Sequence, residues 1–475
     1  MLSDFQNTRR DFLLRGGAGF GAMALTGMMA ADTRITSRPR PALPSPNAPR
    51  QPHFAPTAKR VIFLFMEGGP SHMDLFDPKP LLNELAGQTM PASFKRPITP
   101  MGETESPLLA SPRKWKRHGQ SGLWVSDWLP HTAGCVDDLA VIRSCWTNGI
   151  NHSGGVCQMN TGQPMGGRPS LGSWVSYGLG TENANLPAFV VMTDTTATVT
   201  NGPRNWSAGF MPATYQGTKL NSGAAPIQHL NLPKGVTPGM RLRQLEMLRR
   251  LNEQHLKSRE GQSELEARIR AYELAFRMQA SAPQLINLSN ETQRTLDLYG
   301  VQPETPNFAR DCLLARRMIE KGVRFVQLSL GDWDHHANIF GSFPQLCQQL
   351  DQPVAALIQD LKQRGLLDDT LVIWGGEFGR TPVAQPQKTA PVGRDHHVHS
   401  FTMWFAGGGT RPGANVGATD DLGFHPVDRS IHIHDLQATI LHLLGLDHTR
   451  LTYRFQGRDF RLTDVHGKVI RALLA

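Results

Sequence analysis

The sequence is poor in cysteine. Its 475 residues include five cysteines, an odd number, and no two of them are spaced as Cys-x-x-Cys. This pattern indicates neither a disulfide framework nor a zinc site built from thiolates. The five are Cys135, Cys145, Cys157, Cys312 and Cys347.

An apolar run long enough to span a membrane is also missing. A helix needs about 20 apolar residues to cross a bilayer. The apolar stretch from Gly16 to Met29 is shorter, and no later stretch reaches that length. We therefore expect no transmembrane segment in the mature chain.

The chain beyond its N-terminal 60 residues carries little net charge. The formal net charge is +9, but residues 1–60 hold nine Lys and Arg against three Asp and Glu, which leaves +3 for the other 415 residues. So small an excess does not indicate a basic face that covers nucleic acid. We expect no nucleic-acid partner.

The N-terminus itself has the features of an export signal. The segment "NTRRDFLLRGGAGFGAMALTGMMAAD" places Arg9 and Arg10 before a short apolar stretch and ends in small residues. It resembles a twin-arginine signal, the bacterial address for proteins exported in a folded state. The glycines weaken the alternative, an ordinary amphipathic helix. We predict a signal over residues 1–31, a Pro-rich linker over 32–59, and a periplasmic or secreted protein.

The remaining chain, residues 60–475, reads as one large α/β domain. Its continuous apolar runs are typical of strands buried on both faces, and each is bounded by a turn or by polar residues. They begin near residues 61, 139, 188, 324, 370 and 401. Helical spacing precedes the strand at 324 and covers 343–365. Helices that lead repeatedly into buried strands predict a layered fold with a largely parallel sheet and helices on both faces.

The amino-acid composition changes in the middle of the chain. From Thr237 to about Ala282 the sequence is dense in Arg, Glu, Gln and Leu, with a break near Gly261. This pattern predicts a long helical hairpin inserted into the domain. The hairpin is either a solvated insertion or an interaction surface.

Polar clusters stand at the ends of five predicted strands. Ligand sites of α/β sheets lie beyond the carboxyl ends of the strands, so these clusters are where we look for chemistry. They are "MEGGPSHMDLFDPKP", "NGINHSGGVCQMNTG", "GDWDHHANI", "GGEFGRTP" and "VGRDHHVHSF". The candidate site residues within them are Asp74, His152, Ser153, Asp332, Asp334, His336, Glu377, Arg380, Arg394 and His396.

These residue types suit a divalent metal. Neutral imidazole and ionised carboxylate are ligands for zinc and similar ions, and Asp334 and His336 point to the same side if their loop is extended. His335 then points away or supports a ligand from behind. The alternative is a polar loop with no metal, but several convergent clusters favour a site.

The same motifs carry a resemblance to a known family. "GGPSHMDLFDPKP", "NHSGG", "WDHHANI", "GGEFGRTP", "GRDHHVHSF" and the C-terminal "IHDLQATILHLLGLDHTRLTYRFQGRDF" resemble the bacterial family called domain of unknown function 1501, from about residue 60 to the end. That family resembles in turn the alkaline phosphatase and sulfatase superfamily. The resemblance implies an alkaline phosphatase/sulfatase-like fold and hydrolysis of phosphate or sulfate esters at one or two metals, with zinc or calcium as the expected ion.

Some of the superfamily's metal ligands have a counterpart at the matching position of this sequence, and one does not. The Asp-x-x-x-His spacing matches Asp332 and His336, whereas the closer family favours Asp334 as the carboxylate, so both remain candidates. A later single histidine ligand matches His396. The superfamily's Asp-His pair falls on Glu377 and Phe378, where the second ligand has been lost.

The positions of the superfamily's nucleophile and of its first acidic ligand can also be matched, but the residue at the nucleophile position differs. Relatives place their nucleophile nine residues before the threonine of a Thr-Gly pair, which leads to His152, with Ser153 beside it. The acidic ligand after the first strand falls at Glu67 or Asp74.

We therefore expect an exported, metal-dependent hydrolase acting on an anionic ester, such as a sulfated polysaccharide. Arg380 or Arg394 would pair with the substrate's anionic group, and His152 or Ser153 would act as nucleophile or base. The alternative is a non-catalytic envelope or ligand-binding protein that retains the fold.

Overall fold

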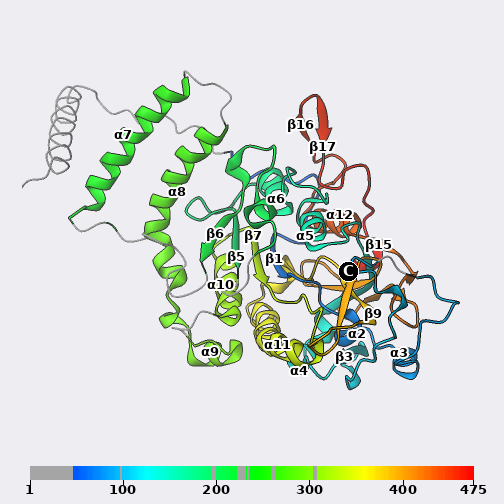
Figure 1. Cartoon of the computed structure of the whole chain (residues 1–475). Coiled ribbons are helices and arrows are strands. Elements are labelled where there is room, and N and C mark those ends of the chain that lie inside the picture. Colours follow the sequence, from blue (N-terminus) through cyan, green and yellow to red (C-terminus); the bar gives the residue numbers. More distant parts are fainter. Residues whose placement is uncertain are drawn as a thin grey trace, which may run out of the picture. The chain divides into compact units, whose positions relative to one another are not determined.

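The computed structural model describes one of the two compact units of the chain, residues 46–475 (Figure 1). Within it, residues 97–98, 194–198, 222–231, 233–234, 258–262 and 303–306 are not described. The predicted twin-arginine signal and the first part of the linker, to residue 45, lie outside the described residues. Of the helices that are described, none is both long enough and apolar enough to cross a bilayer.

A central sheet contains every strand predicted from the apolar runs. These strands are β1 (Arg60–Met66), β4 (Leu139–Trp146), β5 (Phe189–Thr193), β7 (Phe325–Leu330), β8 (Thr370–Gly375) and β11 (Phe401–Ala406). Three short strands complete it, β6 (Thr218–Asn221), β12 (Asn415–Val416) and β15 (Ile431–His432). The order is β12-β4-β11-β8-β1-β7-β5-β6, and β15 pairs with β4.

The directions of the strands decide where the polar clusters meet. Every neighbouring pair in this sheet is parallel except the two that involve β11, which runs antiparallel to both β4 and β8. Strands β1, β4, β7 and β8 therefore end at one edge of the sheet. Because β11 is reversed, the segment that precedes it lies at this same edge.

Helices cover both faces of the sheet. Side chains alternate along a strand, so β1 contributes Ile62, Leu64 and Met66 to one core and Val61 and Phe63 to the other. The first core includes α10 (Phe308–Glu320) and α11 (Ile339–Gln363), and the second includes α5 (His152–Thr161), α6 (Leu171–Leu179) and α12 (Ile433–Leu443). Two covered faces explain the continuous apolar runs, and the predicted α/β fold is confirmed.

Two boundaries differ from the sequence expectation. Helix α11 begins at Ile339, before the apolar spacing starts at Phe343, and its preceding residue Asn338 has the left-handed backbone angle φ of 47°. Residues 46–59, assigned to the linker, form neither a helix nor a strand, yet backbone hydrogen bonds attach them to the domain. For example, the amide of Arg50 donates to Leu179 O and that of Thr57 to Leu443 O.

Two helices occupy the region of the predicted helical hairpin, α7 (Pro238–Lys257) and α8 (Ser263–Ile286). The remaining helices are α2 (His72–Leu75), α3 (Pro80–Glu84), α4 (Pro130–Ala133) and α9 (Gln293–Tyr299). The smaller strand pairs are β2 (Trp115–His118) with β3 (Leu123–Ser126), β9 (Gly379–Gln385) with β10 (Gly393–His397), β13 (Ala418–Thr419) with β14 (Pro426–Asp428), and β16 (Tyr453–Phe455) with β17 (Arg458–Phe460).

Candidate metal centre

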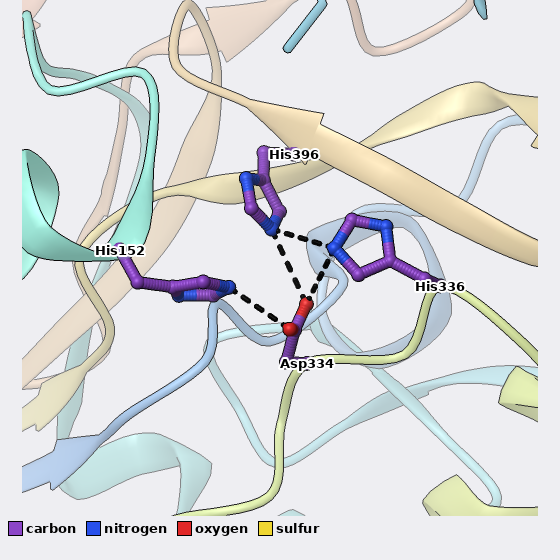
Figure 2. A group of neighbouring side chains, drawn as sticks. All are labelled: His152, Asp334, His336 and His396. Atoms are coloured by element: carbon purple, nitrogen blue, oxygen red, sulfur yellow. Dashed lines mark hydrogen bonds and ion pairs between the residues drawn. The ribbon is translucent and has the colours of Figure 1, made fainter. Parts of the chain in front are cut away.

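Four potential metal ligands converge at the edge of the sheet where the polar clusters meet. One ligand atom from each of His152, Asp334, His336 and His396 lies within 4.8 Å of all the others (Figure 2). Asp334 is at the centre of the group: its Oδ1 is 2.9 Å from His336 Nε2 and 3.2 Å from His396 Nε2, and its Oδ2 is 3.1 Å from His152 Nε2. His336 Nε2 and His396 Nε2 are 2.9 Å apart.

Three separate parts of the chain deliver these side chains. Asp334 and His336 lie in the loop after β7, and His152 is the first residue of α5, whose amide at Gly154 is capped by the side chain of Asn151. His396 lies on β10, directly opposite Arg380 of β9. The order and direction of the strands thus bring together residues that are far apart in the sequence.

The loop after β7 owes its position to a glycine in the loop after β1. Gly68 has a positive backbone angle φ of 119°, and a Cβ added there would lie 2.5 Å from Asp334 N. Only glycine tolerates both this angle and this close approach. His335 points to the other side of its loop, is buried, and packs edge-on against Phe343 with ring centroids 5.4 Å apart.

The outer nitrogen of two of the histidines is held by a neighbouring side chain. His152 Nδ1 is 2.7 Å from Glu377 Oε1, and His336 Nδ1 contacts Gln385 Oε1. Histidine ligands of metals are commonly oriented in this way, by a partner on the nitrogen that does not face the ion. Nδ1 of His396 is buried and has no hydrogen-bond partner among the described residues.

Glu377 therefore supports a ligand instead of joining the four. Its side chain is fully buried and also accepts the amide hydrogen of Gly68 at 3.0 Å. Phe378, in the position where the superfamily pattern has a second ligand, fills the space beside the cluster. Its ring centroid lies 4.5 Å from that of His396 and 5.1 Å from that of His152. An aromatic ring there leaves no donor for a second ion.

The two predicted substrate-binding arginines have other partners. Arg380 is fully buried and donates to Asp334 Oδ1 at 2.7 Å and to the carbonyl oxygens of Gly69 and Arg394 at 2.9 and 3.1 Å. Arg394 is also fully buried and pairs with Asp74 at 3.0 Å. Because their donors are used inside the protein, Arg380 orients Asp334, and neither arginine is placed to meet a substrate anion.

The other predicted site residues lie outside the cluster. Asp74 is buried in its ion pair with Arg394 and accepts the hydroxyl of Ser71, so it is not directed at the four ligands. Asp332 is exposed and has a left-handed backbone angle φ of 66°. Ser153 is exposed and donates its hydroxyl to Asn201 Oδ1 at 2.8 Å.

Burial, hydrogen bonds and neighbouring charges shift the pKa values of the groups in the cluster. Burial would raise the pKa of Asp334, but hydrogen bonds with the three histidines and the charge of Arg380 hold that pKa well below its usual range. Burial would lower the pKa of His152, but its hydrogen bonds to Asp334 and Glu377 raise it to about 9. Burial lowers the pKa of His396 to about 4. Without a metal, His152 is thus protonated at neutral pH, whereas His396 is neutral.

Glu67 is a further acidic residue at this edge, and the sequence left open whether it or Asp74 is the acidic ligand after the first strand. It directly follows β1, is buried, and accepts the amide hydrogen of Thr200. Burial raises its pKa to about 7, the hydrogen bond from Thr200 opposes the rise, and the nearby charge of Glu377 adds to it. A carboxyl group with this pKa can accept a proton near neutral pH. The signal in the sequence was its position between a buried strand and two glycines.

The cluster fits a metal ion of the zinc type in both chemistry and spacing. Tetrahedral coordination with bonds of 2.0–2.1 Å places neighbouring ligand atoms roughly 3.3 Å apart. Separations of 2.9, 2.9, 3.1 and 3.2 Å join neighbouring atoms of the cluster, the 3.1 Å one to Asp334 Oδ2 and two others to Asp334 Oδ1, and one ligand atom from each residue lies within 4.8 Å of the others. Three imidazoles and one carboxylate form a donor set that zinc and similar ions favour.

A family model gives the family to which the sequence belongs. The model named protein of unknown function (DUF1501) matches residues 58–474, which is nearly the whole described unit. The chain belongs to this family. The match confirms the resemblance carried by the motifs.

Solved structures similar to this DUF1501 protein include several bacterial enzymes. The lipoteichoic acid synthase LtaP from Listeria monocytogenes is 11% identical, with 88% of this chain and 78% of that chain covered and a TM-score of 0.34. Alkaline phosphatase from the Antarctic bacterium TAB5 is 12% identical (82% and 98% covered, TM-score 0.30), and a phosphonate monoester hydrolase from Silicibacter pomeroyi is 14% identical (67% and 68%, TM-score 0.29). At TM-scores this low, the likenesses carry no argument about activity. No curated protein sequence matches the chain significantly.

Proposed function

We propose that this DUF1501 protein is an exported metal-dependent hydrolase of phosphate or sulfate esters. The observation that carries the proposal is the convergence of His152, Asp334, His336 and His396, with a separate partner holding the outer nitrogen of two of the histidines. This arrangement supports a bound ion, because metal-binding histidines are typically oriented by a partner on the ring nitrogen that faces away from the ion.

The donor set supports zinc or a similar first-row ion and argues against calcium. Calcium takes six to eight oxygen ligands, whereas three of the four donors here are imidazole nitrogens. Phe378 favours a single ion, because its ring occupies the position of the missing second ligand.

The chemistry follows from the groups around the ion. A bound ion of this kind polarises an ester oxygen and lowers the pKa of a bound water. Glu67 directly follows β1 at the edge where the ligands meet, and it lies close enough to His152 and Glu377 for their charges to act on it, so we assign it to accept the proton of the attacking water. In the overall reaction, water adds its oxygen to phosphorus or sulfur, the ester bond breaks, and the leaving alcohol takes up a proton.

We assign His152 to metal binding and no longer to nucleophilic attack. Glu377 holds its Nδ1, and its Nε2 faces Asp334 together with the other two imidazoles. Its proton, retained up to a pH of about 9 without metal, must leave when the ion binds. Metal affinity is therefore expected to rise with pH up to about 9.

The site of action is proposed from the N-terminus. Arg9 and Arg10, followed by a short apolar stretch, support export through the twin-arginine pathway to the periplasm or beyond. A folded-state export route is compatible with a protein that takes up its metal before transport.

Two measurements on one preparation test the function. Protein exported in its native host is analysed for metals, and the same material is assayed with p-nitrophenyl sulfate, p-nitrophenyl phosphate and a phosphate diester. We expect about one zinc-type ion per chain and turnover of at least one ester class, both abolished by a chelator. Bound metal without any turnover would favour the non-catalytic binding protein, and absence of stoichiometric metal would refute the proposal.

A further inference from the structure

Asp395 is a fully buried carboxylate beside the four ligands, and the proposed reaction makes no use of it. It lies on β10 directly before the ligand His396, and its side chain is 0% exposed. Its Oδ1 accepts the amide hydrogen of His396 at 2.7 Å, and its Oδ2 accepts that of Met101 at 2.9 Å. A buried charge is costly unless an opposite charge as well as hydrogen bonds compensates it. The positive charge that compensates Asp395 therefore has to be identified.

The backbone places this carboxylate at an irregular point of the hairpin formed by β9 and β10. Arg394 is paired with Ala384, but His396 is paired with Arg380, so Asp395 stands opposite three residues of β9 instead of one. Irregular pairing of this kind redirects a side chain and is frequent beside functional sites. Asp395 is thus directed into the protein immediately next to a ligand.

The two neighbouring arginines do not compensate the charge of Asp395. Arg394 forms its ion pair with Asp74 at 3.0 Å. Arg380 forms its ion pair with Asp334 at 2.7 Å. Asp395 therefore has two amide donors but no arginine within ion-pair distance among the described residues.

The nearest basic group is a metal ligand. His336 Nδ1 lies 4.0 Å from Asp395 Oδ1, and no other basic side chain of the described part of the chain comes as close to this carboxylate. Gln385 makes the closer contact with the same nitrogen, but its side chain is neutral. A ring that binds an ion through Nε2 carries part of the positive charge to Nδ1, where a carboxylate stabilises it. Gln385 thus supplies the hydrogen bond, and Asp395 supplies the charge.

The charges around the ligands leave room for one divalent ion. The carboxylates of Asp334, Glu377 and Asp395 carry three negative charges, and Arg380 carries one positive charge, which together give −2 when the imidazoles are neutral. Glu67 adds nothing to this sum when it is protonated and makes it more negative when it is ionised. One ion with two positive charges therefore compensates the excess, and Asp395 contributes half of it.

We propose that Asp395 is a positioning residue of the metal centre, whose buried negative charge is compensated by the bound ion. It acts through two ligands: it fixes the backbone of His396, and it attracts the ring of His336 when that ring shares the charge of the ion. This inference rests on the metal centre of the proposed function and adds to it a residue that touches no substrate.

The test measures metal affinity in the full-length protein. Binding of Zn²⁺ to the native protein and to Asp395→Asn is compared by competition with a chromogenic chelator at one pH. Loss of a partner that supports a ligand weakens metal binding about 10–100-fold, and we expect a loss of this size. The visible absorption spectrum of the Co²⁺-loaded variant at saturation should match that of the native protein, because all four ligands remain.

Asp351→Asn is the matched control. Asp351 is 2% exposed, and its carboxylate accepts the amide hydrogens of His131 and Thr132, both at 2.7 Å. It lies on α11 and holds α4, and neither helix carries a ligand. Both Asn variants lose an acceptor for a backbone amide, so urea unfolding of the metal-free proteins should show a similar loss of stability. Only Asp395→Asn should weaken Zn²⁺ binding.

Two further variants replace these if either does not fold. Asp395→Ser also removes the charge beside the ligands. Asp137→Asn removes an exposed carboxylate that accepts the amide hydrogens of Gln120 and Ser121 at 2.9 and 2.7 Å. The same difference in Zn²⁺ affinity is expected between them.

The outcomes separate this inference from the function on which it rests. Unchanged Zn²⁺ affinity in Asp395→Asn, an equal loss in the control, or an altered Co²⁺ spectrum would overturn the role of Asp395 and leave the hydrolase standing. Tight Zn²⁺ binding without turnover of any ester would overturn the hydrolase, and the affinities of the variants would still decide the role of Asp395. A native protein that binds no Zn²⁺ would overturn both.

Discussion

Replacing His336 with alanine should remove most of the bound metal, whereas replacing its neighbour His335 should not. The two side chains point to opposite sides of one loop: His336 Nε2 lies 2.9 Å from Asp334 Oδ1, and His335 packs against Phe343. The two variants thus replace histidines at adjacent positions of the same loop, and only the replacement of His336 removes a proposed ligand.

The size of the effect follows from sharing the binding free energy among the ligands. Structural zinc sites with four ligands bind with about 10–16 kcal/mol, or about 3 kcal/mol per ligand. Loss of that amount weakens binding about a hundredfold or more. His335→Ala keeps all four ligands and opens a small cavity, so it should lower the unfolding free energy by about 1–3 kcal/mol and leave metal affinity within a few-fold of the native protein.

Competition with a chromogenic chelator at fixed pH measures both affinities, and circular dichroism in urea measures both stabilities. His336→Ala should show the large loss of affinity, and His335→Ala the loss of stability. Equal metal affinity of the two variants would refute the assignment of His336 as a ligand, and the segment "WDHHANI" would then be a polar loop.

Four further outcomes are expected. In metal-free protein the raised pKa of His152, about 9 against 6.5 unfolded, gives a stabilisation of about 3 kcal/mol that is complete below pH 6.5 and lost by pH 9, so the melting temperature should fall across this window and fall less in His152→Gln. Glu377→Gln should weaken metal binding about 10–100-fold without removing a ligand, as measured by chelator competition; unchanged affinity would contradict its orienting role. Arg316→Met removes the buried cation shared by Glu291, Glu320 and Asp360, each of which keeps a second arginine partner, and should lower the unfolding free energy in urea by about 1.5–3 kcal/mol, whereas a loss under 1 kcal/mol would show that the network contributes little. Lysine at both Arg9 and Arg10 should leave precursor in the cytoplasm on fractionation, and normal export would rule out the twin-arginine route.

Local patterns predicted the strands and part of the site because their causes are local. A strand covered on both faces must be apolar at every position, so runs such as those at Val61 and Leu371 were recognisable without knowledge of their neighbours. Two residues one position apart in an extended loop share a side, so Asp334 and His336 were expected together. The structure brings them together, with His335 on the other side.

The roles of the charged residues could not be assigned in the same way. Arg380 and Arg394 resemble substrate-binding arginines in sequence, but one is buried against Asp334 and the other against Asp74. Whether an arginine meets a ligand or a carboxylate of its own chain depends on which side chains surround it after folding. Neither composition nor spacing contains that information.

By itself, the sequence determined which segments become buried strands and which of them end in metal-binding residue types. The tertiary structure decided which of those residues meet. His152 and Glu377 are 225 positions apart, and they touch because β4 and β8 end at the same edge of the sheet. His396 arrives there because β11 runs in reverse and places its preceding hairpin at that edge. The order and direction of strands are set by packing of the whole core, so a site assembled from several strand ends is decided only when the chain has folded.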